Sequence, residues 1–234
     1  MKNTITGPRA AEFTAGILIA ALVWMPTSAF AQKKEDLPET HDGLVLVPDR
    51  KVAAAYADPE ADFSVYNKIM LLDCYVAFKK DWQRDQNRSR TSARITAEDT
   101  EKIKAEVAKL FREVFTEVLE GDGGYEVVDA AGDDVLLIRP AIIDLDITAP
   151  DKPTAGRSRT YTSTSGAATV YIELFDSVSG DILARAADRK EARRAGGYIS
   201  YTNRVTNTAD ARRTLKSWAN ILRTRLDEIH GKAS

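Results

Sequence analysis

Residues 67–78 constrain the fold more than any other stretch of this sequence. From Ile69 to Phe78 the side chains alternate between two faces, and both faces are apolar apart from Asp73. A strand that is apolar on both faces lies in the middle of a sheet that other elements cover. The sequence therefore predicts a central strand here. Cys74 falls on its wholly apolar face, which predicts a buried, unreactive thiol.

Two segments have the apolar spacing of long amphipathic helices. The first begins at Thr96, an expected N-cap with Asp99 three residues later, and ends at Gly121. The second runs from about residue 208 to residue 229 and ends before Gly231. Both stripes recur at helical spacing: Ile103, Val107, Leu110, Phe111, Val114, Phe115, Val118 and Leu119 in the first, and Leu215, Trp218, Ala219, Leu222, Leu226 and Ile229 in the second.

Further strands are expected at residues 125–128, 135–147, 168–175 and 182–187, the last two joined by a hairpin turn at Ser179-Gly180. Pro140 lies inside one of these strands and predicts an edge position or a bulge, because proline donates no ladder hydrogen bond. Residues 81–93 are rich in charge and read as an exposed connection. This order predicts an α+β fold: a single, mostly antiparallel sheet with two long amphipathic helices packed on one face.

The first 31 residues have the pattern of a cleaved signal peptide: Lys2 and Arg9, an apolar core, and small residues ending in Ala29 and Ala31. The apolar core of about eleven residues is too short to span a bilayer. We therefore expect a periplasmic protein with no transmembrane segment after cleavage. No cysteine lies near the cut, so no lipoprotein anchor is expected. Residues 32–59 read as a weakly ordered lead, in which 43–47 could be an edge strand or a packed segment, and residues 60–234 as a single α+β domain.

No catalytic, cofactor or metal signature emerges from the rest of the chain. His41 and His230 have no second ligand at metal-binding spacing, and no serine lies in a G-x-S-x-G turn. Asp144 and Asp146 are two residues apart on one strand face and could divide acid and base roles or hold Ca²⁺, although a solvated strand face explains them more simply. Residues 121–124 are glycine-rich but end a helix, whereas phosphate loops begin one.

Two long polar segments carry the strongest local bias. Residues 151–165 are rich in Ser, Thr and Arg, and residues 189–204 contain five basic residues against one acidic residue, in a chain of net charge −2. If the segments meet at one end of the sheet, their arginines and tyrosines form a surface suited to an anionic or protein partner. The alternative is two solvated loops, or a further strand at residues 198–201. The predicted partner-binding residues are Arg157, Arg159, Tyr161, Arg193, Arg194, Tyr198, Tyr201 and Arg204.

Three segments resemble one bacterial family. They are residues 61–66 (ADFSVY), the hairpin from Leu174 through Gly180 to Arg189, and the closing helix with Trp218-Ala219 and Leu222 to Asp227. Together they resemble the secreted bacterial domain of unknown function 3313 family, over about residues 43–229. The resemblance implies an exported α+β protein and no established activity. Many members are lipoproteins, whereas this chain lacks the lipid-bearing cysteine.

These observations favour a non-enzymatic periplasmic envelope protein that binds an envelope component or a protein partner. One alternative is a hydrolase that uses the carboxylate pair Asp144 and Asp146. Another is a subunit of an envelope assembly, with the apolar helix stripes partly at an interface. Nucleic acid is not expected as a partner, because an exported protein rarely meets it.

Overall fold

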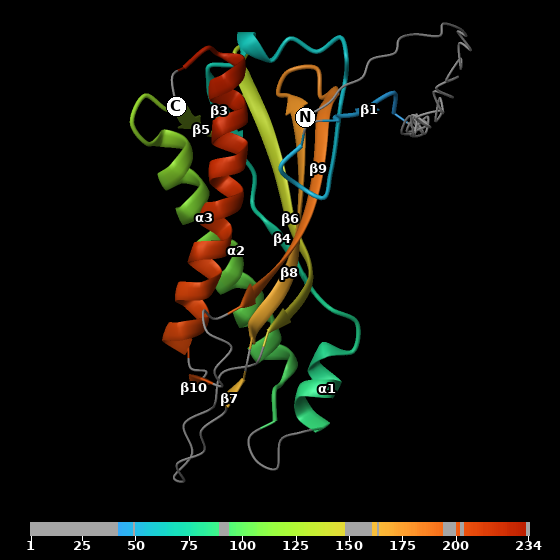
Figure 1. Ribbon diagram of the computed structural model, residues 1–234, viewed down its shortest axis with the longest axis vertical. Helices are drawn as coiled ribbons and strands as arrows, with labels where there is room; N and C mark the ends of the chain where they lie inside the picture. Colours follow the sequence, from blue (N-terminus) through green and yellow to red (C-terminus); the bar gives the residue numbers. More distant parts are fainter. Residues whose placement is uncertain are drawn as a thin grey trace, which may run out of the picture. The chain divides into compact units, whose positions relative to one another are not determined.

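An eight-stranded sheet carries the fold in the part of the chain that the structure describes (Figure 1). The computed structural model describes residues 42–48, 50–88, 94–147, 161–162, 164–193, 200–201 and 204–232, which lie in one unit, Asp36–Ser234. The strands of the sheet are β1 (Val45–Leu46), β2 (Ala54–Ala57), β3 (Lys68–Leu71), β4 (Tyr75–Phe78), β5 (Glu126–Val128), β6 (Val135–Ile147), β8 (Thr164–Asp176) and β9 (Ile182–Arg193). A separate ladder joins β7 (Tyr161–Thr162) to β10 (Ser200–Tyr201).

The strand order is β1-β2-β9-β8-β6-β3-β5, and β4 also pairs with β6. The four neighbouring pairs along β1-β2-β9-β8-β6 are antiparallel. On the other side of β6, both β3 and β4 pair with β6 in parallel, and β5 pairs with β3 in parallel. The hairpin β8–β9 turns through Gly180, which has a positive φ of 77°. The predicted α+β fold with a mostly antiparallel sheet is confirmed.

Two long helices, α2 (Ala97–Glu120) and α3 (Arg204–Ile229), pack on one face of the sheet (Figure 1). They run in the same direction, because Arg212 pairs with Glu113 while Arg223, further along α3, reaches Val118. Thr96 and Asp99 form the capping box of α2, as the sequence predicts.

The core lies between these helices and the sheet. Phe111 and Phe115 of α2 stack with their ring centroids 3.9 Å apart, and both are fully buried. They pack among the inward side chains of β6, including Ile138 and Ile142, and against Trp218 of α3. This apolar burial holds the domain together without a disulfide, since Cys74 is free and buried.

The prediction of one strand at residues 67–78 is wrong, because the structure has two. β3 ends at Leu71 opposite Ile138, and β4 begins at Tyr75 opposite Ala141 of the same neighbouring strand. Between them on β6 lies Pro140, which has no N–H to donate to a strand on that side. The proline therefore occurs in a central strand rather than at an edge, and the ladder beside it is interrupted.

The β6 bulge occurs between Ile143 and Asp146, not at Pro140. Asp144 takes a positive φ of 51° there, which breaks the strict alternation that placed Asp144 and Asp146 on one strand face. Leu145 is consequently buried in the core while Asp144 is exposed.

Residues 81–93 are not simply an exposed connection. They contain a short helix, α1 (Trp82–Arg88), whose first residue is buried. The Trp82 ring stacks on Phe78 at 3.9 Å, and its indole N–H donates to the carbonyl of Ile147 at 2.8 Å. In the expected lead, β1 and β2 extend the sheet beyond β9, and β1 lies in the run 43–47 for which an edge strand was one alternative.

Candidate functional site

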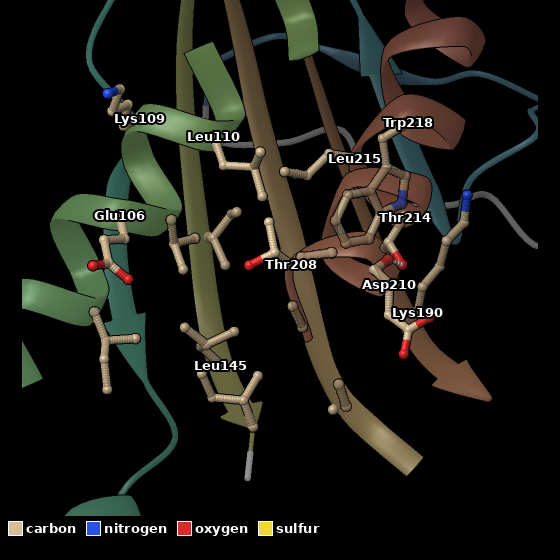
Figure 2. Close-up of a pocket in the computed structure, with 18 of the residues that line it drawn as sticks. Glu106, Lys109, Leu110, Leu145, Lys190, Thr208, Asp210, Thr214, Leu215 and Trp218 are labelled. Carbon is tan, nitrogen blue, oxygen red and sulfur yellow. Dashed lines mark hydrogen bonds between the residues drawn. The ribbon is translucent and has the colours of Figure 1, made fainter. Parts of the chain in front are cut away.

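A cleft of about 310 Å³ opens between the first halves of α2 and α3 and the end of the sheet (Figure 2). The side chains of Leu110 and Leu215 enter it from the two helices, over the strands that form its floor. Apolar groups dominate the lining: Ile103, Val107 and Leu110 of α2, Ile142, Leu145 and Ile147 of β6, and Ala211, Leu215 and Trp218 of α3.

The cleft exists because the strand and helix residues there are small. The β8 residues that line the cleft are Gly166, Ala167 and Ala168, and α3 contributes the small side chain of Ala211. Gly166 has a φ of +148°, and a Cβ at this position would lie only 2.7 Å from the Cγ2 of Ile147. Any larger residue at 166 is therefore strained, so the close approach of β8 to β6 at the cleft requires glycine.

The apolar stripe of α2 divides into two parts. In its second half, Phe111, Val114, Phe115 and Leu119 are buried in the core, and Val118 packs against it partly buried. Its first half, with Ile103 and Val107, is only half-buried and lines the cleft. An amphipathic helix normally buries its whole apolar stripe in the core. Because Ile103 and Val107 are only half-buried, the first half of α2 retains apolar surface that a ligand can cover.

Charged and polar side chains surround the apolar interior. Glu106, Lys109 and Glu113 follow the α2 side, and Glu113 also accepts from Arg212 of α3 at 3.2 Å. Lys190 of β9 and Asp210 of α3 lie on the opposite side (Figure 2).

A hydrogen-bond network fixes the α3 wall. The indole N–H of Trp218 donates to Asp188 of β9 at 2.8 Å, and the backbone N–H of Ala53 donates to the same carboxylate at 3.0 Å. The ammonium of Lys190 donates to Ser217 at 2.7 Å and lies 5.5 Å from the centre of the Trp218 ring. These bonds connect the α3 wall of the cleft to β9 and to Ala53, just before β2. The wall is therefore in place without a ligand.

Described residues at or near the ends of the two polar segments named from the sequence line the cleft. Gly166 directly follows the segment 151–165, and Lys190 belongs to the segment 189–204. Ile147 and Thr208, which also line the cleft, lie a few residues outside the two segments. The β7–β10 ladder brings the two segments together at Tyr161 and Tyr201.

The predicted partner-binding side chains themselves fall outside the description. Arg157, Arg159, Arg194 and Tyr198 lie outside the described residues, while Tyr161, Arg193, Tyr201 and Arg204 are described only as backbone positions of β7, β9, β10 and α3. The cleft residues were not predicted as a site. The signals for them were the run Gly166-Ala167-Ala168 and the length of the α2 stripe.

Two of the other candidates from the sequence, Asp146 and His230, have structural partners, while His41 lies outside the described residues. Asp146 pairs with Lys79 at 3.0 Å. His230 has its Nδ1 2.8 Å from the Leu226 carbonyl and 3.2 Å from the Tyr125 hydroxyl. Burial raises the pKa of the Cys74 thiol to about 12, so this thiol is not a nucleophile at neutral pH.

Metal-binding clusters and membrane-spanning helices are both absent from the described part of the chain. No group of three or more His, Cys, Asp and Glu side chains is placed there to hold a metal ion. Nor does any helix among those residues have the length and hydropathy to cross a bilayer.

A family model described as "Protein of unknown function (DUF3313)" matches residues 40–222. The chain belongs to the DUF3313 family. No curated protein matches it. Among solved structures, the PelC dodecamer from Paraburkholderia phytofirmans is similar, with 10% identity, coverage of 68% of this chain and 90% of that chain, and a TM-score of 0.33. A Xanthomonas campestris protein of family DUF330 is similar with 13% identity, coverage of 79% and 94%, and a TM-score of 0.34.

Proposed function

We propose that this DUF3313 protein is a non-enzymatic binding protein of the bacterial periplasm that holds an envelope component in the cleft between α2, α3 and the sheet. The observation that carries the proposal is the apolar cleft with a charged rim. Its volume of about 310 Å³ lies at the lower end of the roughly 300–1,000 Å³ that small-molecule sites occupy. The predicted signal peptide supports the periplasmic location.

The composition of the cleft supports binding rather than catalysis. Its interior side chains are aliphatic or, at Trp218, aromatic with the N–H already bonded to Asp188. Apolar walls exclude water and reward burial of apolar ligand surface, while a few polar groups at the rim orient the ligand.

The hydrolase alternative has less support. Asp144 is exposed at the bulge and Asp146 is paired with Lys79, and neither carboxylate lines the cleft. General acid–base catalysis needs both groups within reach of one bound substrate.

The test compares two alanine-to-leucine variants. Ala211→Leu places an isobutyl group in the cleft, whereas Ala105→Leu adds the same group at an exposed position of α2 that does not line it. The immobilised protein is incubated with an envelope extract, and the retained small molecules are identified by mass spectrometry.

We expect one class of molecule to be enriched on the wild type and on Ala105→Leu, and to be reduced at least about tenfold on Ala211→Leu, which corresponds to about 1.4 kcal/mol. Equal retention by both variants, or no enrichment on the wild type, would remove the cleft as the binding site.

A further inference from the structure

A second, more open recess continues outward from the cleft, between the end of β9 and α3. Lys190, Asp210 and Thr214 line both spaces, so the two are continuous. The remaining residues of the recess are Arg189, Glu191, Arg213 and Ser217. The apolar interior of the cleft therefore leads directly to a polar compartment.

The cations of this recess are presented to solvent. Arg189 is exposed, and its guanidinium donates to the Thr169 hydroxyl at 3.4 Å. The side chain of Arg213 is 73% exposed although it pairs with Asp210 at 3.2 Å. Asp210 is the buried member of this pair, and the hydrogen bond to it uses one guanidinium nitrogen of Arg213, so the other donors on the exposed side remain available to a ligand.

Lys190 marks the junction between the two spaces. Its ammonium is 2.7 Å from the Ser217 hydroxyl and 3.9 Å from the Asp188 carboxylate. Asp188 already accepts hydrogen bonds from Trp218 and Ala53. The ammonium can therefore donate to a further acceptor at the mouth of the cleft, while its aliphatic stem lies along the apolar wall.

Among the charged side chains that line the recess, cations outnumber carboxylates, which favours an anion there. Arg189, Lys190 and Arg213 supply three cations against the carboxylates Glu191 and Asp210. Asp210 is only 8% exposed and is held by Arg213, so its charge is compensated within the wall.

We infer that the ligand is a single-chain anionic amphiphile, whose alkyl chain fills the cleft and whose carboxylate or phosphate lies beside Lys190, Arg189 and Arg213. This inference rests on the proposed function, because it names the chemistry of the molecule in that cleft. Each methylene group taken from water strengthens binding about fourfold. An anion that accepts from Lys190 and Arg213 forms charge-assisted hydrogen bonds, which are stronger than neutral ones. The small volume of the cleft suits one chain.

The experiment measures displacement of the neutral apolar dye N-phenyl-1-naphthylamine from the protein. Four amphiphiles share one alkyl chain and differ in the head group: decanoate, decyl phosphate, decanol and decyltrimethylammonium. All are used below the concentrations at which they form micelles. We expect both anions to displace the dye at concentrations at least about tenfold lower than decanol, and the cation to be weakest. The tighter of the two anions identifies the head group.

Three variants locate the head group. Lys190→Gln and Arg189→Gln each remove one cation of the recess, and we expect each to reduce the preference for the anions over decanol at least about threefold. Arg225→Gln is the matched control, because Arg225 is an exposed α3 arginine paired with Glu228 that lies outside both spaces. It should keep the full preference.

The outcomes separate this inference from the proposed function. If all four amphiphiles displace the dye equally and Ala211→Leu abolishes dye binding, the cleft binds apolar chains and the anionic head group is wrong. If no amphiphile displaces the dye while Ala211→Leu still loses the envelope molecule, the ligand class is wrong and the proposed site remains. If Ala211→Leu affects neither assay, both are wrong.

Discussion

Replacing Arg223, a mostly buried arginine of α3, with alanine should strongly destabilise this protein. The guanidinium Nε of Arg223 lies 2.8 and 2.7 Å from the two carboxylate oxygens of Asp227. Both side chains are only 14% exposed. The remaining guanidinium nitrogens donate to backbone carbonyls that the end of α2 leaves without helical partners: Val118, Leu119, Gly121 and Asp122.

The magnitude follows from these contacts. Removing one member of a buried ion pair costs about 3–5 kcal/mol, because the other charge stays buried. Without Arg223, the Asp227 carboxylate would still accept from the hydroxyl of Tyr125 at 3.1 Å, but within the described residues it would have no cation beside it. The carbonyls of Leu119 and Gly121 keep the backbone N–H groups of Tyr125 and Gly124. The donors lost at Val118 and Asp122, and the lost cation at the C-terminus of α2, act in the same direction. We expect a loss of about 3–5 kcal/mol in the free energy of unfolding, or about 6–20 °C in Tm for a domain of this size.

Urea unfolding followed by circular dichroism measures this loss. Arg225→Ala is the control, since Arg225 lies two residues further along α3 with its side chain 57% exposed, and its surface pair with Glu228 contributes at most about 1 kcal/mol. Arg223→Lys should recover only part of the stability, because an ammonium cannot bridge several carbonyls as a guanidinium does. A loss below about 1 kcal/mol for Arg223→Ala, matching the control, would refute the idea that this arginine joins α3 to the end of α2.

Three further predictions concern single residues. Cys74, with a pKa raised to about 12 by burial, should resist a thiol reagent at pH 8 until the protein is unfolded, and labelling of the native protein at the rate of free cysteine would contradict its burial. Tyr66 has a pKa raised to about 12 by burial and by its hydrogen bond to Asp176. Its contribution to stability should therefore be full below about pH 10 and lost as the pH rises towards 12. A wild-type minus Tyr66→Phe difference spectrum at 295 nm that titrates near pH 10 would argue against the raised pKa. Gly124→Ala should lower the free energy of unfolding by about 1–3 kcal/mol, because the added Cβ clashes with the carbonyl oxygen of Leu119, and a neutral effect in urea would show that the turn adjusts freely.

Sequence patterns correctly predicted those structural features that depend only on residues close together in the chain. The Thr96–Asp99 capping box and the apolar spacing of α2 lie within a few turns of chain, and both were confirmed. The split of residues 67–78 into β3 and β4 depends instead on Pro140, which is far along the sequence and lies beside the break only after folding. Within residues 72–74 only Asp73 interrupts the apolar pattern, and one charged residue does not by itself predict that the strand breaks there.

The cleft could be anticipated only in part. The two polar segments were identified from charge, and residues at or near their ends do line the cleft. The apolar interior was assigned to the core, because Ile103 and Val107 have the same spacing as the buried half of α2. Whether such a stripe is covered depends on the position of α3 over the sheet and on small residues such as Gly166, which helical periodicity does not encode.

Pro140 also bears on how the chain avoids aggregation while it folds. β6 is 13 residues long and mostly apolar, a composition that favours pairing with the same strand of another copy before the helices cover it. Arg139 and Pro140 divide it into two shorter apolar runs. A charge next to a residue that cannot donate to a ladder interrupts intermolecular pairing at the middle of the strand. In the folded protein the gap between β3 and β4 lies beside Pro140, so no strand residue there needs the N–H that proline lacks, and the sheet contains the proline at its centre.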